Sequence, residues 1–311
     1  MSVTLKDDGC PVCGSQDRHQ LGRAGKRNTV FERFGRDIEQ VNTVRCRNCT
    51  ALYIAPMVHF SDSLQAQLYN IEYFASADGV RDQKNMREKE SILDILERVT
   101  RPLTGRSLLD IGCGTGEYLV AASKRGMSVT GIDVEASLAE HIQRKYGLRV
   151  MTGSFGDDTV PPGSFDVIVL SHVIEHLQEP VPLLGSIHRA LKPTGIFIMA
   201  TPNFDSLLES LKDLYGRLRY DRARSYFLTP FTSPYHVLGF NVTSARHILE
   251  KTGFTPIYLK VFSGLEWDDD SRKLAMRTIK VLGALVRRGM NLVTISRKQE
   301  SITALTAKLE P

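Results

Sequence analysis

The sequence predicts an α/β fold in which a seven-stranded sheet has helices on both faces, preceded by a small module built around four cysteines. Three observations lead to this prediction. Apolar runs alternate with helical patterns from residue 107 onward, which is typical of a largely parallel sheet. The first of these runs ends in three glycines at alternate positions. Two Cys-x-x-Cys pairs stand within the first 56 residues.

The composition is that of a soluble globular protein with more than one module. The 311 residues are 42% apolar and 24% charged, which suits one α/β domain and an accessory module. The net charge of +5 is spread along the chain and does not by itself indicate a nucleic-acid partner. We see no apolar signal region and no apolar stretch long enough to span a bilayer. With five cysteines in such a chain, we expect a reducing, cytoplasmic location.

The four N-terminal cysteines predict a zinc ribbon in residues 1–56. Cys10 and Cys13 form one Cys-x-x-Cys knuckle, and Cys46 and Cys49 form a second. Two such knuckles close a tetrahedral site with no open position, so the zinc would be structural rather than catalytic. The alternative is four unrelated thiols, which the repeated spacing disfavours.

Residues 57–104 are expected to form a helical connector between this module and the α/β domain. An amphipathic helix is predicted over 85–96, with its apolar side packed on the next domain. Tyr69 and Tyr73 precede it and could border a ligand pocket, although packing is the simpler interpretation.

The glycine turn is the most informative stretch of the α/β domain. Asp110 ends an apolar run, and Gly112, Gly114 and Gly116 follow it. An ordinary glycine-rich turn is one interpretation, but a dinucleotide site needs Gly-x-Gly-x-x-Gly and would have a glycine where Glu117 stands. The alternate spacing therefore indicates a different ligand that approaches bare backbone.

Six further strands are expected after the first. They are 128–133, 149–152, 165–170, 195–201, 253–261 and 291–296. Asp110, Asp133 and the pair Ser171 and His172 all stand at the ends of expected strands. Because ligands in such sheets bind beyond the carboxyl ends of the strands, we expect these residues around one cleft.

The ordered motifs over most of residues 105–300 resemble class I S-adenosylmethionine-dependent methyltransferases. The chain is most similar to those with an N-terminal zinc ribbon, in which a Cys-Pro-x-Cys knuckle and a second knuckle are followed by an apolar run and proline, here 51–56. Many members of that group look like enzymes that modify sugars, polysaccharide precursors or other secondary metabolites. The resemblance implies a Rossmann-like methyltransferase sheet, S-adenosylmethionine as cofactor and a structural zinc ion.

The resemblance also implies a set of cofactor-binding residues. The three glycines would line the methionine part of the cofactor, Asp110 would orient the turn or meet the amino group, and Asp133 would bind the ribose hydroxyls. The alternative for Asp133 is a helix N-cap. The family often has an acid near the adenine just after the third strand, but here the first acids are Asp157 and Asp158, so Ser154 or Phe155 would contact the adenine instead. The complete set is Asp110, Gly112, Cys113, Gly114, Gly116, Asp133, Ser154, Phe155 and Ser171.

Three histidines are the candidate catalytic residues. His172 and His176 lie in a His-x-x-Glu-His stretch that resembles the family's post-strand motif. It also matches an inverted zinc-protease pattern, but it follows a strand and is soon stopped by prolines. One histidine could take the proton of an acceptor hydroxyl. His236, in a Pro-Tyr-His element, is the preferred base or acceptor-binding residue and His176 the next. A divalent ion on Glu175, His176 and His236 is conceivable, but spacing alone does not establish it.

Two segments extend the domain. Residues 204–240 are expected to form a substrate lid, and 265–289 a helical insertion, before a C-terminal tail at 301–311. Basic and apolar residues interleave over 272–288, which suits packing within the domain, a subunit contact or a peripheral membrane contact.

The expected function is methylation of a hydroxyl on a small-molecule, saccharide or lipid-linked acceptor. One alternative is an RNA methyltransferase that binds RNA through its zinc ribbon, and another is an inactive zinc-ribbon binding protein. Residues 171–174 do not form the Asn/Asp-Pro-Pro-Tyr motif of base-nitrogen methylation, which weighs against that reaction but not against methylation of ribose or other base atoms. We do not expect a nucleic-acid partner. The intact glycine turn and Asp133 argue against the inactive alternative. The acceptor, the methylated atom and the oligomeric state are left open.

Overall fold

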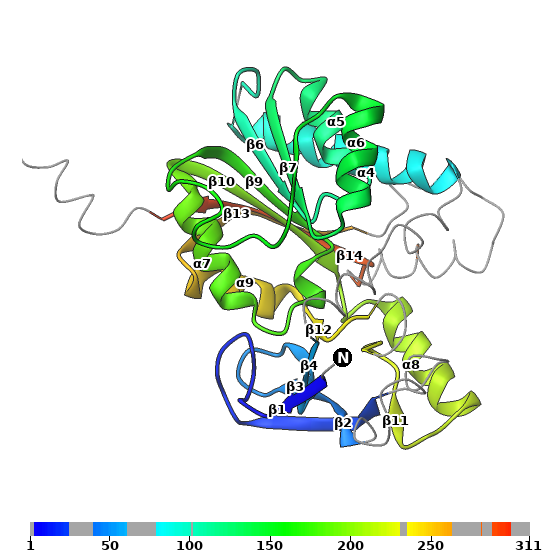
Figure 1. Ribbon diagram of the computed structural model, residues 1–311. Coiled ribbons are helices and arrows are strands. Elements are labelled where there is room, and N and C mark those ends of the chain that lie inside the picture. The colour runs from blue at the N-terminus through cyan, green and yellow to red at the C-terminus, as the bar shows by residue number, and fades with distance from the viewer. Residues whose placement is uncertain are drawn as a thin grey trace, which may run out of the picture.

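The structure is a computed structural model that describes residues 3–24, 40–60, 79–100, 102–230, 235–262, 281 and 288–299. These residues form a large sheet with helices on both faces and a smaller sheet that lies against one end of it (Figure 1). Tyr69, Tyr73, the 301–311 tail and most of the predicted 265–289 insertion lie outside the described residues.

The large sheet has all seven strands that the sequence predicted. In sheet order they are β13 (Phe254–Phe262), β14 (Asn291–Lys298), β10 (Leu191–Pro202), β9 (Phe165–Ser171), β6 (Ser107–Ile111), β7 (Ser128–Asp133) and β8 (Val150–Thr152). The strands from β10 to β8 run parallel, but β14 is antiparallel to both β10 and β13. The sheet is therefore mixed, because β14 returns between two strands that point the same way.

Helices cover both faces of this sheet. They are α4 (Gly79–Thr100), α5 (Glu117–Ser123), α6 (Ala136–Tyr146), α7 (Pro180–Ala190) and α9 (Val242–Lys251), with a short 3-10 turn, η2 (Ile174–His176). Leu108 and Val167 pack with α4 and α5, whereas their neighbours Leu109 and Ile168 pack with α7 and α9. This alternation follows from the two-residue period of a strand, and it explains why the strands are apolar throughout.

Local sequence sets the helix boundaries near the glycine turn. α5 begins directly after Gly116, which adopts the left-handed conformation with φ 87°. α6 is capped by Glu135, whose side chain accepts a hydrogen bond from the Ser137 N–H at 3.2 Å. The N-cap alternative for Asp133 is therefore wrong. α9 starts with a reciprocal capping box between Asn241 and Ser244.

The smaller sheet joins the cysteine module to the predicted lid segment. Its order is β11 (Arg224–Ser225), β2 (Arg18–Ala24), β3 (Asn42–Cys46), β4 (Leu52–Ala55) and β12 (Leu238–Gly239), with β1 (Val3–Lys6) and β5 (Met57–Phe60) paired beside it. Both edge strands, β11 and β12, come from residues 204–240. The helix of that segment, α8 (Leu207–Arg219), lies beside the same sheet in Figure 1. The 204–240 segment thus completes the N-terminal sheet.

The two units share a core and several polar contacts. Buried apolar residues from both belong to one continuous cluster that includes Leu52 and Leu170. Lys251 on α9 donates to the Val12 carbonyl at 3.1 Å, inside the first cysteine knuckle. The cysteine module is therefore packed on the large domain.

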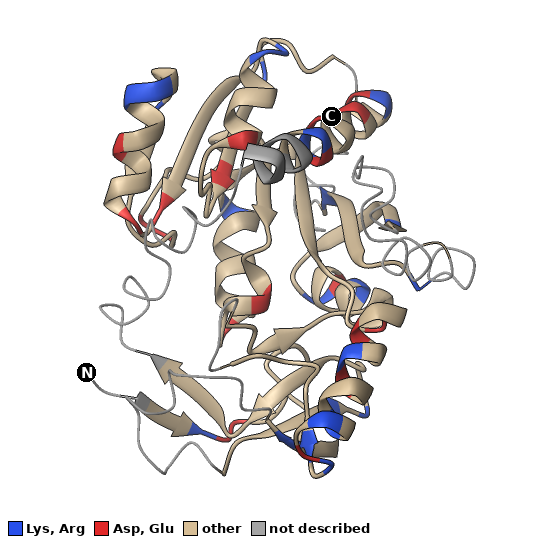
Figure 2. Ribbon diagram, turned by 90° about the vertical axis from the view of Figure 1, so that its right-hand side faces the viewer, with Lys and Arg blue, Asp and Glu red and all other residues tan. Residues whose placement is uncertain are grey.

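Charge is mixed on both units. Figure 2 shows acidic and basic residues interspersed in the described part of the chain, with several basic residues along α8. No helix in the described ranges is long and apolar enough to cross a membrane.

Candidate functional site

The glycine turn lies between the end of β6 and the start of α5. Gly112, Gly114 and Gly116 all have positive φ, at 68°, 53° and 87°, a region that favours glycine. A Cβ at Gly112 would lie 2.5 Å from Cγ2 of Val173. The turn therefore requires glycine at this position and leaves bare backbone at the carboxyl end of the sheet.

Asp133 ends β7, and its carboxylate ties that strand to the glycine turn. Oδ2 accepts a hydrogen bond from the Gly114 N–H at 2.9 Å, and Oδ1 accepts one from the Glu135 N–H at 3.1 Å. The side chain is buried, and burial raises the pKa of its carboxyl. Each oxygen has a second acceptor site, so Asp133 can also meet a diol at this edge.

Asp110 and Ser171 come together around a lysine from α4. Burial raises the pKa of the Asp110 carboxyl well above its usual value, although the charge of Lys89 opposes this. Lys89 is itself buried, and its Nζ donates to Ser171 Oγ at 3.2 Å. Lys89 therefore bonds to one predicted cofactor residue, Ser171, and acts electrostatically on another, Asp110, and this cation was not predicted.

Cys113 points away from the cleft. Its side chain is buried in the core on the α4 and α5 face of the sheet. A Cβ at Gly131 would lie 2.8 Å from Cys113 Sγ, so the sulfur fills the space that this glycine leaves. Only the backbone of Cys113 faces the turn.

The segment after β8 lies beside Asp133. The Gly153 N–H donates to the Asp133 carbonyl at 2.8 Å, which places Ser154 and Phe155 next to the end of β7. Ser154 is exposed, and Phe155 is half-buried against the core. The late acid Asp157 instead contacts side chains on α7, so it is directed away from the glycine turn.

His172 lies between two buried carboxylates. Its Nε2 is 3.5 Å from Glu88 Oε1, and its Nδ1 is 3.4 Å from Glu175 Oε1. Burial alone would lower the pKa of His172, but the ion pairs with Glu175 and Glu88 outweigh it and raise the pKa to about 9. Burial opposes ionisation of both carboxyls, yet the neighbouring cations hold the pKa of each at about 2. A pKa above neutrality favours the protonated ring of His172, which has no free lone pair to accept a proton.

Glu175, His176 and His236 form a compact cluster. One possible ligand atom from each lies within 4.8 Å of the others, and the two imidazole centroids are 5.0 Å apart. Glu175 is fully buried, and its Oε2 accepts a hydrogen bond from Thr201 Oγ1 at 3.1 Å. Burial lowers the pKa of His176, and it lowers that of His236 to about 3. Both rings are therefore neutral at physiological pH.

The cysteine module helps to place His236. The adjacent Val237 donates its N–H to the Glu175 carbonyl at 3.0 Å and accepts a hydrogen bond from the Ile54 N–H at 3.2 Å. Leu238 then pairs with Tyr53 of β4. The backbone beside His236 is thus held between η2 and the N-terminal sheet.

The four N-terminal cysteines converge. Cys10 Sγ is 3.6 Å from Cys49 Sγ, and Cys13 Sγ is 3.5 Å from Cys46 Sγ, with all four sulfurs within 4.8 Å of one another. Zinc–sulfur bonds of about 2.3 Å in a tetrahedron place sulfurs about 3.8 Å apart. The sulfurs therefore fit a four-thiolate zinc site.

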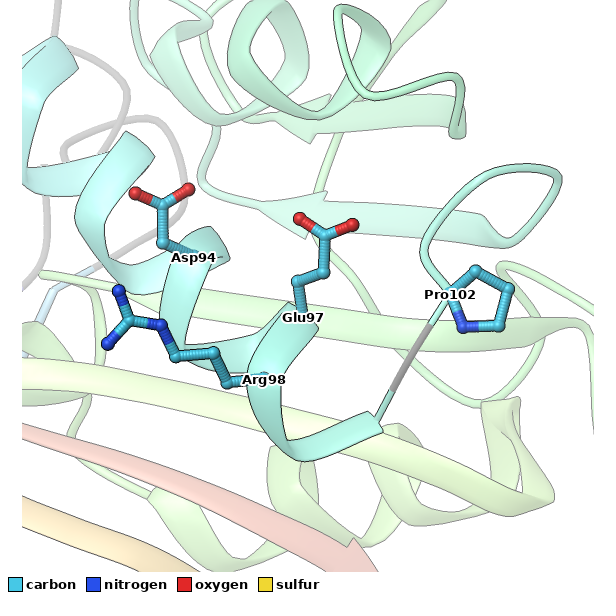
Figure 3. A pocket seen from close by; sticks show the side chains of 4 residues that line it. All are labelled: Asp94, Glu97, Arg98 and Pro102. Carbon is cyan, nitrogen blue, oxygen red and sulfur yellow. The ribbon is translucent and has the colours of Figure 1, made fainter.

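A pocket of about 410 Å³ lies elsewhere, between the end of α4 and the approach to β6. It is lined by Asp94, Glu97, Arg98 and Pro102 (Figure 3). This is the amino end of β6, opposite the glycine turn, so the pocket is not part of the candidate site.

Three buried polar residues beside the candidate site were not among the residues predicted from the sequence. Glu88 and Lys89 read as part of the charged face of the helix before the domain, and Thr201 as an ordinary strand end. The only sequence signal for Glu88 and Lys89 was their place one turn before the apolar positions of α4.

Comparison with known proteins agrees with this geometry. A family model described as "Methyltransferase domain" matches residues 83–259. A Mycolicibacterium smegmatis protein named "Probable S-adenosylmethionine-dependent methyltransferase" is 27% identical over 161 residues, which are 51% of this chain and 56% of the relative. A ubiquinone biosynthesis O-methyltransferase of Pseudomonas aeruginosa is 37% identical over 107 residues, or 32% and 46% of the two chains.

The chain spans about half the length of these curated relatives. A solved structure from Listeria monocytogenes, described as an S-adenosylmethionine-dependent methyltransferase, superposes with a TM-score of 0.50 at 18% identity. It covers 69% of this chain and 98% of its own. At that identity the likeness concerns the fold.

Proposed function

The chain belongs to the methyltransferase-domain family, and from this premise we propose that it transfers the methyl group of S-adenosylmethionine to a hydroxyl of a small-molecule, saccharide or lipid-linked acceptor. One observation carries the cofactor assignment: the Asp133 carboxylate is bonded to the backbone of a three-glycine turn at the carboxyl edge of the sheet. This arrangement suits a ligand with both a diol and an amino-acid end.

The acceptor is assigned to the cluster of Glu175, His176 and His236 because these groups are close to one another and follow strands β9 and β10. In the transfer, a lone pair of the acceptor oxygen forms the new C–O bond. The C–S bond breaks, its electron pair returns to sulfur, and the hydroxyl proton goes to a base. Alignment of oxygen, methyl and sulfur supplies much of the rate.

His236 as the base, with His176 next, stays a prediction. Their closeness to each other and to Glu175 supports it, whereas the raised pKa of His172 favours its protonated form, which cannot accept a proton. His172 would instead stabilise the carboxylates of Glu88 and Glu175.

The four cysteines are assigned a structural zinc ion, supported by their sulfur–sulfur distances. Zinc supplies no chemistry to the reaction in this arrangement, because four thiolates leave it no open position. The interspersed charge of the described residues gives no support to an RNA-binding role.

Calorimetry with S-adenosylmethionine tests the proposal. We expect saturable binding in the wild type and at least about tenfold weaker binding in Asp133→Ala. Asp157→Asn is the control, because Asp157 is an aspartate of the same edge that contacts α7 instead. Absence of binding at about 1 mM cofactor, or equal binding in Asp133→Ala, would reject the assignment.

A further inference from the structure

The cluster of Glu175, His176 and His236 has the composition of a metal site. It offers two imidazoles and one carboxylate, with the ligand atoms no more than 4.8 Å apart. Two histidines and a carboxylate bind divalent transition ions while leaving coordination positions open. The four-cysteine site differs, because its ligands are all thiolates.

The carboxylate of Glu175 is buried in a way that a cation would explain. The side chain has 0% exposure. Its Oε2 is held by Thr201, but Oε1 has no hydrogen-bond partner within the described part of the chain. His172 Nδ1 is the ion-pair partner of Oε1, at 3.4 Å, but does not form a hydrogen bond with it. Because a buried carboxylate oxygen normally accepts hydrogen bonds, Oε1 keeps an acceptor position that a metal cation would fill.

The two rings are held by contacts outside the cluster, as ligating histidines commonly are. His176 Nδ1 faces the Tyr235 carbonyl oxygen at 3.4 Å, and the ring of His236 packs edge-on against Phe204 with centroids 5.7 Å apart. Such contacts fix ring orientation before a metal binds and so reduce the cost of ordering its ligands.

We propose that Glu175, His176 and His236 bind one divalent first-row transition cation whose open positions take the acceptor oxygen. The inference rests on the proposed function for the identity of that oxygen, but metal binding itself does not depend on it. The two histidines then act as ligands, and the role of His236 as a free base is replaced. The cation lowers the pKa of the bound hydroxyl, and the proton leaves to water. The oxygen lone pair then forms the C–O bond as the C–S bond breaks toward sulfur.

The test is a Mn²⁺ titration of the full chain with zinc already in its cysteine site, followed by electron paramagnetic resonance of the free ion. Mn²⁺ is the probe because oxygen and imidazole ligands accept it, whereas thiolates favour zinc. The variants are Glu175→Gln, His176→Ala and His236→Ala. His141→Ala is the matched control, since His141 is a half-buried histidine on α6 outside the cluster.

We expect one Mn²⁺ per chain in the wild type and the control, and binding at least about tenfold weaker in each cluster variant. Wild-type affinity in both histidine variants, or no Mn²⁺ bound to the wild type at about 1 mM, would overturn the proposal. If Glu175→Gln fails to fold, the histidine variants decide. S-adenosylmethionine calorimetry on the same samples separates the two proposals. A protein that binds the cofactor but not Mn²⁺ rejects the metal site alone. A protein that binds Mn²⁺ but not the cofactor rejects the cofactor assignment alone.

Discussion

The Gly114 N–H donates to Asp133 Oδ2 across 2.9 Å, so the turn after the first strand of the domain is fixed by the end of the second. The same carboxylate holds the Glu135 N–H where α6 begins. The conformation of the turn is therefore set by side-chain chemistry before any ligand arrives, which lowers the cost of ordering it on binding.

Gly112→Ala should destabilise the protein more than Gly147→Ala. Both glycines have left-handed φ, 68° and 66°, so each substitution costs about 1 kcal/mol or more in backbone strain. Only at Gly112 does the added methyl collide, 2.5 Å from Val173 Cγ2, whereas no described atom lies within 4 Å at Gly147. Urea unfolding measures both. The double variant Gly112→Ala/Val173→Ala removes the Val173 methyl groups and should recover part of the stability lost in Gly112→Ala. Equal losses of stability in the two single variants would contradict the steric argument.

Asp110→Asn should stabilise the cofactor-free protein increasingly as pH rises. The folded-state pKa of Asp110 is raised above its unfolded value by burial, so the folded state retains a proton that the unfolded state releases. Stability is then lost as pH rises from about 4 toward the folded pKa, at up to about 1.4 kcal/mol per pH unit. Urea denaturation of both proteins between pH 5 and 8 gives their free energies of unfolding, and the difference between the two isolates the contribution of Asp110. A constant difference across that range would show that Asp110 does not titrate as described.

Removal of the proposed zinc ion should release the backbone beside His236 as well as the cysteine knuckles. β12 pairs with β4, which directly follows the second knuckle. Hydrogen exchange with and without a strong chelator should show lost protection at both Ile54 and Val237, whose backbones are bonded to each other. Cys46→Ser should reproduce the effect. Cys113→Ala should not, because Cys113 is buried in the α4 and α5 face of the core. A loss of protection confined to the knuckles would contradict the coupling.

Val237→Pro should impair the Glu175, His176 and His236 cluster. Proline removes the N–H that donates to the Glu175 carbonyl, which costs about 1–3 kcal/mol for a buried acceptor left unpaired. Methyl transfer should fall while S-adenosylmethionine binding is retained. Val242→Pro is the matched control, because Val242 is the first residue of α9 and that position tolerates proline. Equal activity in the two variants would refute the positioning role.

Sequence patterns predicted the strands because each is a short apolar run that ends at a polar or glycine-rich position. The pattern says nothing of strand direction, so the antiparallel setting of β14 emerged only from the structure. β11 and β12 were also beyond prediction. Each has two residues and exists only through pairing with a distant strand, β2 or β4.

Sequence patterns single out candidate residues whose type has few alternatives, and they pass over residues whose role depends on burial. Few kinds of site use three alternate glycines followed by an acid at the end of the next strand, so this pattern predicts a particular ligand. Glu88 and Lys89 do not, because a charged pair on a helix is normally solvated, whereas here both are buried and contact His172 and Ser171. For Cys113 the motif gave the position, but the side chain is directed into the core rather than the cleft.

The placement of β11 and β12 at the two edges of the N-terminal sheet affects how chimeras should be designed and how the two segments evolve. The cysteine module and residues 204–240 are far apart in the chain, yet both contribute strands to one sheet. A chimera that exchanges only one of them between homologues would pair mismatched strands. The two segments should therefore be transplanted together, and we expect them to vary together among the relatives that carry both.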